Sequence, residues 1–540
     1  MSRLRGPGSG QLLIGEIFRR NAEVVADWPA ASLGDALIYH GELNAAGNRM
    51  AHALRELGIR HGDRVVCWAD TCLEVLPLFV ALAKLGAVFA PLNARLGAEE
   101  AIDIVRMARP ALLVSDAGHA VAAASVAEQL GLERLARLGS KTLGSNDLGS
   151  IDSRSDDSDS DTPATSGRSG DGPGIDLEAI SRQQSSGEVI EPELTETDPH
   201  VIFFTSGSTG RPKGVVLSHR ANHLRTFQGV FRDEPERSVC MFPLFHMAAF
   251  TLGLSAWQTR GEIAFVSVAS ADELLSATER RRANRLYCIP AVWARILETE
   301  PDRYDTSSLK EVDTGTSATP IELIRALKQR FPDSATRIYY GSTEIGSGTT
   351  LPDADVLRKP GSVGPASPGV DLKLTDEGEI CLRSPYVMDG YFDDPEATHA
   401  ALIDGWYHTG DLGVLDADGY LSITGRKQEL IRTGGEAVVP SEVEAVLAEH
   451  PAVQELAVVG IPDPEWGEIV CAVVVTTQGA SLSLEDLQSH CEGRLAGFKQ
   501  PRRLERIDRL PRTSATGQLQ RTLLVEQIVS RTSTPVPSHS

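Results

Sequence analysis

Apolar residues follow helical and strand-like patterns in turn through the first part of the chain. A helix that stops at Gly58 is predicted by apolar residues at helical spacing, namely Leu43, Ala46, Met50, Leu54 and Leu57. The pattern then predicts a strand at 64–68, a helix at 73–85, a strand at 87–90, a helix at 101–108 and a strand at 111–115. Alternation of this kind predicts an α/β fold with a largely parallel sheet.

The pattern breaks off between about residues 140 and 190. This stretch is rich in Ser, Asp and Gly and nearly free of large apolar residues. Such a segment cannot bury enough surface to offset its ordering entropy, so we predict a disordered acidic insertion.

Periodic patterns return in the second half of the chain. Strands are predicted at 263–268, 285–289 and 336–340. Near the C-terminus the pattern predicts strands at 455–460, 469–476 and 504–507 and a helix at 484–495. We also expect Ser441 to cap a helix, with Glu444 as its capping-box partner. The C-terminal part is therefore expected to form a small α+β domain.

Composition and charge restrict the class of protein. The 540 residues suffice for a large domain plus a small one, and the net charge of −22 argues against binding to nucleic acids or anionic membranes. The longest apolar run, near 75–83, is too short for a transmembrane segment, and the N-terminus lacks a signal peptide pattern. The seven cysteines form no C-x-x-C pair, which favours reduced thiols and a cytoplasmic protein.

A loop of small and hydroxylated residues lies between the apolar runs Val201–Phe204 and Val215–Leu217. It contains Thr205, Ser206, Gly207, Ser208, Thr209, Gly210 and Lys213. Its glycines let backbone N–H groups approach an anion, its hydroxyls are donors, and Lys213 adds a positive charge. We interpret strand, loop and strand as a cradle for polyphosphate, without the residue order of a Walker A loop. By composition alone, a surface hairpin is an equal alternative.

The full string T-S-G-S-T-G-x-P-K-G resembles the signature loop of the adenylate-forming superfamily, which includes acyl- and aryl-CoA synthetases, luciferases and peptide-synthetase adenylation domains. The resemblance covers roughly residues 12–525 apart from the insertion. It implies a large N-terminal AMP-binding domain of stacked sheets and helices (1–426) and a small mobile α+β lid (427–528). Residues 529–540 are expected to form a flexible tail.

Two further stretches resemble the nucleotide motifs of this superfamily. Tyr340-Gly341-Ser342-Thr343-Glu344 matches Y-G-x-T-E. The resemblance implies that Tyr340 stacks on adenine, Gly341 permits close approach, Thr343 bonds a phosphate and Glu344 binds Mg²⁺. Gly315 lies in a loop that replaces the family's adenine-contacting G-G-A-P loop, with only one of the two glycines kept.

Other positions complete the implied site. Asp411 is expected to accept the ribose hydroxyls, since one carboxylate can accept two O–H donors, and Arg426 should approach the ribose or phosphate. His246, in a P-L-F-H stretch, should gate or line the acyl pocket, although a histidine in such a place is more often a packed core residue. Gly434, Gly435 and Glu436 resemble the loop that contacts the pantetheine of coenzyme A.

One position departs from the family chemically. The family's lysine that bridges the carboxylate and the α-phosphate is replaced by Gln518, which brings no positive charge. Loss of one preorganised stabiliser typically costs about 10²–10³ in rate. Lys499 is a weak candidate for compensation, because the family also has a lysine there.

The resemblance implies an ATP-dependent acyl-CoA synthetase for a fatty, alicyclic or aryl carboxylic acid, with ATP, Mg²⁺ and CoA as its cofactors and substrates. One alternative is an acyl-AMP ligase that loads an acyl carrier protein. A second is a binding or regulatory protein with impaired adenylation, motivated only by Gln518. The acid's chain length is left open.

Overall fold

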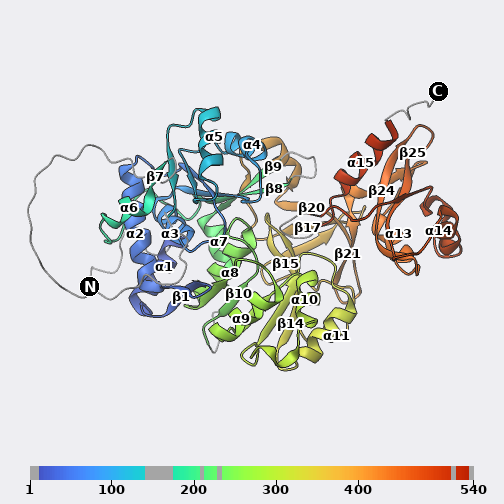
Figure 1. Cartoon of the computed structure of the whole chain (residues 1–540), viewed down its shortest axis with the longest axis horizontal. Coiled ribbons are helices and arrows are strands. Elements are labelled where there is room, and N and C mark those ends of the chain that lie inside the picture. Colours follow the sequence, from blue (N-terminus) through green and yellow to red (C-terminus); the bar gives the residue numbers. More distant parts are fainter. Residues whose placement is uncertain (1–10, 140–173, 207–211, 228–233, 513–517, 534–540) are drawn as a thin grey trace, which may run out of the picture. The chain divides into compact units, whose positions relative to one another are not determined.

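The computed structural model describes residues 11–139, 174–206, 212–227, 234–512 and 518–533 (Figure 1). The chain divides into two compact units. The first comprises Met1–Cys288, Arg295–Val312 and Pro385–Thr398, and the second comprises Ile289–Ala294, Asp313–Ser384 and His399–Ser540.

Parallel α/β structure makes up most of the first unit. Its helices are α1 Ile14–Val24, α2 His40–Glu56, α3 Val75–Leu85, α4 Ala98–Ala108, α5 Ala120–Leu130, α6 Leu177–Arg182, α7 His219–Thr226, α8 Met247–Gln258 and α9 Ala271–Arg281, with a 3₁₀ turn η1 at Pro301–Arg303. One sheet has the order β18-β9-β8-β4-β3-β5-β6-β7, and the strands β12-β10-β11-β1-β2 lie in a second. The bounds are β1 Pro29–Leu33, β2 Ala36–Tyr39, β3 Arg64–Trp68, β4 Val88–Leu92, β5 Leu112–Ser115, β6 Leu135–Arg137, β7 Ile175–Asp176, β8 Pro199–Ser206, β9 Pro212–Ser218, β10 Arg237–Cys240, β11 Glu262–Phe265, β12 Arg285–Tyr287 and β18 Gly390–Tyr391.

Aromatic packing around α3 forms the centre of this unit. Apart from the buried Lys84, the helix consists of apolar residues, which is typical of a helix buried all round. Phe79 stacks on Phe250 of α8 at 4.6 Å between ring centroids and meets Phe89 of β4 edge-on at 5.6 Å. These contacts join α3, α8 and β4 in one core and hold the strands that lead into the predicted phosphate loop.

The second unit contains an antiparallel β region and a small α+β body. Its strands are β14 Ala335–Ser342, β15 Gly346–Leu351, β16 Asp371–Leu374, β17 Glu379–Arg383, β19 Leu402–Ile403, β20 Trp406–Leu415, β21 Leu421–Arg426, β22 Ile431–Thr433, β23 Glu436–Val438, β24 Val453–Asp463, β25 Gly467–Thr476 and β26 Arg503–Arg506. Its helices are α11 Ile321–Arg330, α13 Pro440–Leu447, α14 Leu484–Cys491 and α15 Arg521–Ser533, with 3₁₀ turns η2 Lys427–Glu429 and η3 Gly497–Lys499. α10 Pro290–Leu297, β13 Glu311–Gly315 and α12 Pro395–Ala401 cross the division of the units.

The small body is built on both faces of a sheet with the order β23-β22-β25-β24, with β26 paired to β25 (Figure 1). Successive residues of a strand point to opposite faces. Val458 accordingly packs in a cluster with α13 and α14, and its neighbour Val459 packs in a cluster with Leu524 and Ile528 of α15. The predicted α+β character of this region is confirmed.

Most elements predicted from periodicity are present. The predicted strand 64–68 is β3 and the predicted helix 73–85 is α3, which begins at Val75. The strands predicted at 455–460 and 469–476 are β24 and β25. The predicted helix 484–495 is shorter, because α14 ends at Cys491.

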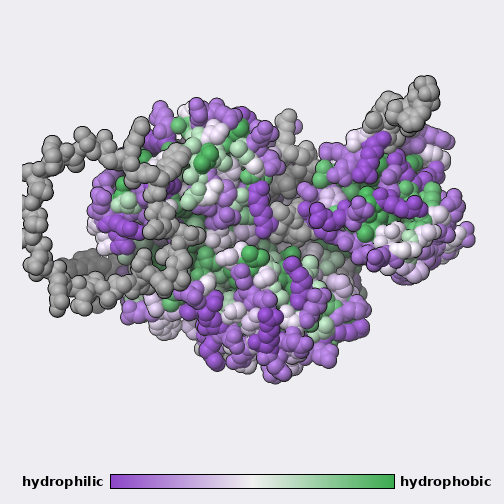
Figure 2. All heavy atoms as spheres, in the orientation of Figure 1, coloured by the Kyte–Doolittle hydropathy of each residue, from purple (hydrophilic) through white to green (hydrophobic). Residues whose placement is uncertain are grey.

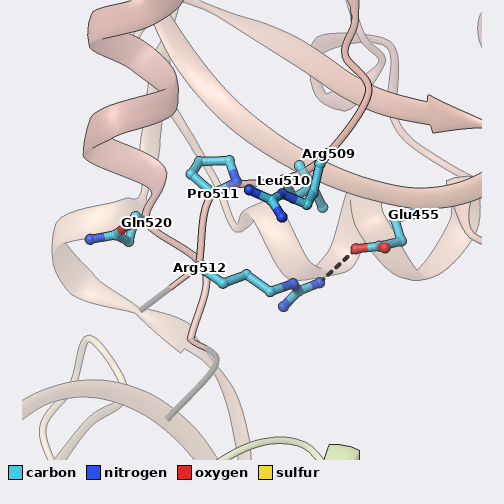
Figure 3. Close-up of a pocket in the computed structure, with 6 residues that line it drawn as sticks. All are labelled: Glu455, Arg509, Leu510, Pro511, Arg512 and Gln520. Atoms are coloured by element: carbon cyan, nitrogen blue, oxygen red, sulfur yellow. Dashed lines mark hydrogen bonds and ion pairs between the residues drawn. The ribbon is translucent and has the colours of Figure 1, made fainter. Parts of the chain in front are cut away.

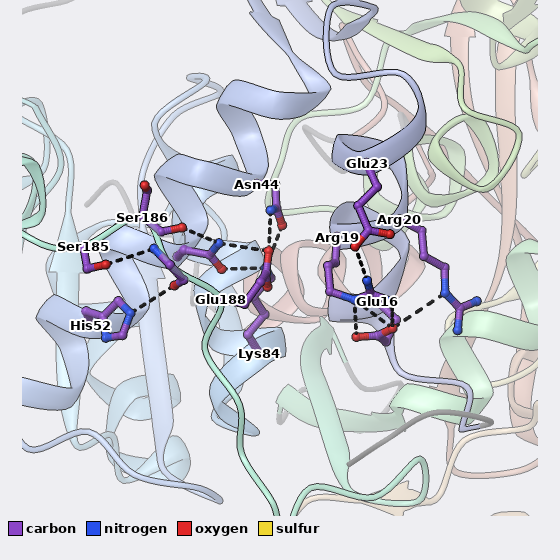
Figure 4. A network of polar contacts seen from close by, with 12 residues as sticks. Glu16, Arg19, Arg20, Glu23, Asn44, His52, Lys84, Ser185, Ser186 and Glu188 are labelled. Carbon is purple, nitrogen blue, oxygen red and sulfur yellow. Dashed lines mark hydrogen bonds and ion pairs between the residues drawn. The ribbon is translucent and has the colours of Figure 1, made fainter. Parts of the chain in front are cut away.

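The structure corrects the C-terminal side of the predicted insertion. Residues 140–173 lie outside the described part of the chain, but residues 174–190 contain β7 and α6 and contact the first unit's helices. Lys84 of α3 donates to Glu188 at 2.7 Å and to Asn44 and Asn48 of α2 at 2.6 Å each (Figure 4). Disorder was therefore the wrong prediction for 174–190, because a buried lysine supplies a distant partner.

Two smaller predictions also fail. Ser441 does not cap α13, whose N-cap is Val439; its hydroxyl donates to the Thr424 carbonyl instead, and Glu444 accepts from the Val458 N–H at 2.8 Å. The predicted tail from residue 529 begins within a helix, because α15 continues to Ser533. The remaining tail residues, 534–540, lie outside the described residues.

Hydrophilic residues cover much of the visible surface (Figure 2). Within the described ranges, no helix is long and apolar enough to cross a membrane. All seven cysteines are free thiols and six of them are buried, as predicted.

Candidate active site

The predicted phosphate cradle stands at the end of the hairpin β8–β9. The two strands are antiparallel, with Thr205 opposite Lys213 and Ser206 opposite Pro212. The Thr205 hydroxyl lies 3.5 Å from the Lys213 carbonyl oxygen. Gly207, Ser208, Thr209 and Gly210 fall in the connecting segment, outside the described residues. The predicted strand–loop–strand order is confirmed in its two strands.

Lys213 lies over an aromatic ring that sequence analysis did not single out. Its Nζ is 4.8 Å from the centroid of Tyr391, whose short strand β18 pairs with β9. A cation over an aromatic face is attracted by about 0.5–1 kcal/mol at exposed sites. Tyr391 therefore holds the Lys213 ammonium next to the segment that connects β8 and β9. Only the pairing of β18 with β9 reveals this contact, since the two residues are far apart in sequence.

His246 stands at the start of α8 and is held as a neutral imidazole. Its Nδ1 accepts the Ala248 N–H at 3.1 Å, and its ring stacks on Phe242 at 5.1 Å between centroids. Burial lowers the pKa of His246 to about 4. Near neutral pH the ring therefore carries its proton on Nε2 and offers a donor without a charge. Phe242 in turn contacts Tyr287 at 5.7 Å, so the surroundings are aromatic.

The predicted ribose carboxylate lies in a compact polar group in the second unit. The Tyr340 hydroxyl donates to Asp411 Oδ2 at 2.7 Å, and Arg426 Nε lies 3.1 Å from Asp411 Oδ1. Asp411 and Arg426 are opposite one another on β20 and β21. The structure thus brings three predicted nucleotide residues together. A carboxylate has about four lone-pair positions, so Asp411 can still accept hydroxyl donors.

Burial dominates the electrostatics of this group. Burial raises the pKa of Asp411 against the opposing effects of Arg426 and Tyr340. Burial and the Asp411 charge also raise the pKa of Tyr340 well above its ordinary value. Tyr340 therefore keeps its proton and acts as a donor that fixes the carboxylate.

A second carboxylate supports the part of β20 that carries Asp411. Glu379 of β17 accepts the Gly410 N–H at 3.2 Å, and its other oxygen lies 3.1 Å from Lys427 Nζ and 3.4 Å from His408 Nδ1. Burial alone would raise the pKa of Glu379, but the hydrogen bonds from Lys427 and His408 hold it below its usual value. Sequence analysis missed this network, because its residues do not form a recognisable sequence motif.

The Y-G-x-T-E stretch occupies the end of β14 and the following turn. Gly341 is required by close packing, because a Cβ there would lie 1.8 Å from the Gly346 carbonyl oxygen. Thr343 and Glu344 lie in the turn to β15 with intermediate exposure. The Glu344 charge contributes to the raised pKa of Asp411, so the two carboxylates act on each other electrostatically. Their roles toward phosphate and Mg²⁺ stay predictions.

The loop after β13 contains a residue with an unusual backbone conformation. Gly315 ends β13, and Thr316 follows with φ at +68°, a left-handed conformation that is unusual for a β-branched residue. Gln518 Nε2 is 3.5 Å from the Thr316 carbonyl oxygen.

The predicted pantetheine loop is a tight turn between β22 and β23. Gly434 and Gly435 have φ values of +59° and +87°, and a Cβ on Gly434 would lie 2.8 Å from the Trp466 ring. Glu436 is exposed at the start of β23. The turn is thus shaped by glycine, and its contact with CoA stays a prediction.

Two cations that could replace the missing lysine charge are engaged elsewhere. Lys499 Nζ lies 2.6 Å from Glu442 Oε1, and Arg512 Nη2 lies 2.9 Å from Glu455 Oε2. The second pair borders a surface pocket that Arg509, Leu510, Pro511 and Gln520 also line (Figure 3). The charges of Lys499 and Arg512 are therefore already paired with carboxylates and do not replace the missing lysine charge at position 518 in this structure.

Comparison with known proteins agrees with this geometry. The family model "AMP-binding enzyme" matches residues 18–392, and "AMP-binding enzyme C-terminal domain" matches residues 442–516. A feruloyl-CoA synthase of Amycolatopsis sp is 32% identical over 518 residues, which cover 92% of this chain and 95% of the relative. An indoleacetate–CoA ligase of Aromatoleum aromaticum is 32% identical over 511 residues, covering 91% of this chain and 93% of the relative.

A solved structure shares the fold as well. ATP-bound MatB from Rhodopseudomonas palustris superimposes with a TM-score of 0.80 at 28% identity, covering 95% of this chain and 98% of that chain. The chain therefore belongs to the AMP-binding enzyme family, in the acid–CoA ligase branch of the adenylate-forming superfamily.

Proposed function

We propose that this enzyme joins a carboxylic acid to coenzyme A in two steps driven by ATP. The acid's carboxylate oxygen attacks the α-phosphorus of ATP, the bond to the bridging oxygen breaks, and pyrophosphate leaves. The CoA thiol, losing its proton, then attacks the acyl carbon of the acyl-AMP, and AMP leaves with the bonding electrons. The observation that carries the proposal is the Tyr340–Asp411–Arg426 group, assembled from separate nucleotide motifs.

In the first step, the described residues bind and orient the nucleotide. Asp411 accepts ribose hydroxyls while Tyr340 and Arg426 hold its carboxylate in place. Lys213 supplies positive charge at the phosphate hairpin. Positioning and charge neutralisation suffice for this chemistry, so no protein nucleophile is required.

The donor set at the β14–β15 turn fits Mg²⁺. Glu344 is a hard carboxylate ligand with the Thr343 hydroxyl beside it, and Mg²⁺ is commonly bound by one or two carboxylates together with substrate phosphates and waters. Mg²⁺ held there by Glu344 would neutralise phosphate charge.

An apolar or aromatic monocarboxylic acid is the substrate class that we favour. His246 is neutral, stacks on Phe242 and is followed by Met247, Ala248 and Ala249. None of these four side chains carries a charge that could pair with a second charged group on the acid. The named relatives act on ferulate and indoleacetate, which are aromatic acids.

A panel of acids tests the proposal. Purified enzyme with ATP, Mg²⁺ and CoA should release AMP only when a suitable acid is present, and it should form the matching acyl-CoA. The panel should include aryl, alicyclic, short fatty and long fatty acids. If replacing CoA with a phosphopantetheinyl carrier protein gives the faster product, the acceptor assignment is overturned in favour of the carrier.

A further inference from the structure

Lys213 differs from many lysines of this chain in the kind of group that holds it. Its Nζ lies 4.8 Å from the centroid of the Tyr391 ring, and among the described residues it has no carboxylate partner. Carboxylates pair with Lys84, Lys328, Lys359, Lys427 and Lys499. A carboxylate neutralises the ammonium that it holds, whereas an aromatic face attracts the cation through its quadrupole and leaves the positive charge in place. Lys213 is thus held without a counter-ion.

Strand pairing places the Tyr391 ring beside Lys213. Tyr391 lies opposite Val215 in the antiparallel pairing of β18 with β9. Residues two positions apart on a strand share a face, so Lys213 is the diagonal neighbour of Tyr391, within reach of a long side chain. The Asp389 carboxylate, two residues before Tyr391, accepts the Ser218 N–H at 2.6 Å. The segment that carries the ring is therefore bonded to the strand that carries the lysine.

The turn that follows fixes Tyr391 from its other side. The Thr398 hydroxyl accepts the Tyr391 N–H at 2.9 Å and donates to the Asp394 carbonyl at 2.8 Å. Gly390 has a φ of +146°, and a Cβ there would lie 2.9 Å from Thr398 Cγ2. Gly390 and Thr398 therefore pack closely and hold the backbone of Tyr391 between them.

We propose that Tyr391 is a positioning residue for ATP: its ring holds the Lys213 ammonium ready for the phosphates without neutralising it. The inference rests on the proposed function, in which Lys213 supplies positive charge to the phosphates. A lysine side chain has many rotamers, and immobilising it on a ligand costs binding free energy. A ring that already restricts the ammonium lowers this cost. The ring covers only one side of the ammonium, so N–H donors are left for phosphate oxygens.

The first test replaces the ring. Tyr391→Leu should raise the Kd for ATP–Mg²⁺ by about two- to fivefold in a calorimetric titration, the factor that a cation–π contact of about 0.5–1 kcal/mol represents. The KM for ATP in acid-dependent pyrophosphate release should rise by the same factor. The KM for the acid and thioester formation from supplied acyl-AMP should stay unchanged. Tyr391→Phe keeps the ring and should keep the native Kd.

The second test asks whether the ring acts through the lysine. Lys213→Met should itself weaken ATP binding, and adding Tyr391→Leu to it should weaken binding no further. The matched control is Tyr304→Leu, which removes a ring 5.3 Å from the Arg303 guanidinium in the same unit and should leave the Kd unchanged. If Tyr391→Leu does not fold, Thr398→Val carries the test, because it removes the hydroxyl that holds Tyr391, and Thr398→Ser should restore native binding.

Three results would overturn the inference. Equal losses in Tyr391→Phe and Tyr391→Leu would assign the effect to the hydroxyl and not to the ring. A further loss when Tyr391→Leu is added to Lys213→Met would mean a merely structural role. A Kd that is unchanged or lower in Tyr391→Leu would mean that the ring does not prepare the lysine for ATP. If no acid yields AMP and acyl-CoA while the ATP titrations differ as expected, the proposed function fails and the role of Tyr391 in ATP binding stands.

Discussion

Gln518 is the residue whose replacement we expect to change the rate of adenylation most. Two anions approach each other in this step, and two cations of the same C-terminal region, Lys499 and Arg512, are paired with carboxylates. We therefore predict that Gln518→Lys raises the adenylation rate by about 10²–10³-fold, the usual worth of one preorganised stabiliser. Pyrophosphate release measures the effect. Gln520→Lys, an exposed change two residues on, is the control, and equal rates in both variants would show that the charge problem is solved elsewhere.

We predict that Asp411 gives the enzyme a characteristic pH dependence. Only the ionised carboxylate can accept two ribose hydroxyls, and burial raises the pKa of Asp411 above its ordinary value. Protonation therefore begins at a higher pH than for an exposed aspartate, and the KM for ATP should rise as the pH falls through that range. Asp411→Asn should show a high KM without this pH dependence. A rise of the same size in the variant would assign the titration to another group.

Thr316 provides a test of backbone strain. A non-glycine residue in the left-handed region costs about 1–2 kcal/mol, whereas glycine loses about 0.4–1 kcal/mol through a freer unfolded chain. Thr316→Gly should thus leave the free energy of unfolding equal or higher by up to about 1.6 kcal/mol. Thr319→Gly, in the same loop but without positive φ, should lower it. Urea unfolding distinguishes the two, and a lower stability for Thr316→Gly would refute the strain argument.

At the scale of elements, a buried cation is one of the contacts that hold the segment 174–190, beside hydrogen bonds from α2 to Ser186 and Gly187. Lys84 is 4% exposed, and its ammonium donates to the carboxylate of Glu188 and to the amide oxygens of Asn44 and Asn48. Glu188→Ala should lower the free energy of unfolding by about 1–3 kcal/mol, the cost of leaving a buried donor without its partner. The exposed pair Arg106–Asp103 gives the control: Asp103→Ala should cost less than about 1 kcal/mol. Equal effects would mean that the segment is not anchored at Lys84.

Local sequence patterns predicted a helix or strand only where neighbouring residues, and not distant contacts, determine its structure. The strand β3 and the helix α3 were predictable because their apolar residues are contiguous and end at a glycine or polar residue. The ordering of 174–190 was not, because Glu188 finds its partner 104 residues away. The role of Ser441 failed for a similar reason, since its acceptor is Thr424 on the neighbouring β21.

The sequence predicted the motif residues of the candidate site, but it did not predict the residues that hold them in place. Tyr340, Asp411 and Arg426 each lie in a recognisable stretch, and the structure joins them. Glu379 and Tyr391 carry no such signal, because they act through contacts that only strand pairing creates. Residues that hold functional groups in place are thus the part that sequence patterns leave out.

At the scale of the whole molecule, buried histidines should make the protein sensitive to acid. Burial lowers the pKa of His40 to about 4 and that of His219 to about 3. Unfolding restores a pKa of about 6.5, so the unfolded chain binds more protons and stability falls as the pH drops below that value. Each histidine should contribute a slope of about 1.4 kcal/mol per pH unit until its folded pKa is reached. Urea midpoints between pH 7.5 and pH 5 measure this slope, and a smaller slope for His219→Gln would confirm the assignment, whereas a flat profile would refute it.

The enzyme's central property is the coupling of acid, ATP and CoA in one reaction. The two domains of the AMP-binding enzyme family match the chain, and the structure brings the predicted nucleotide residues Tyr340, Asp411 and Arg426 together. The most direct measurement is acid-dependent AMP release together with acyl-CoA formation across the acid panel. We expect AMP and acyl-CoA in equal amounts with apolar or aromatic acids, faster in Gln518→Lys. Neither product with any acid, in both proteins, would contradict the account.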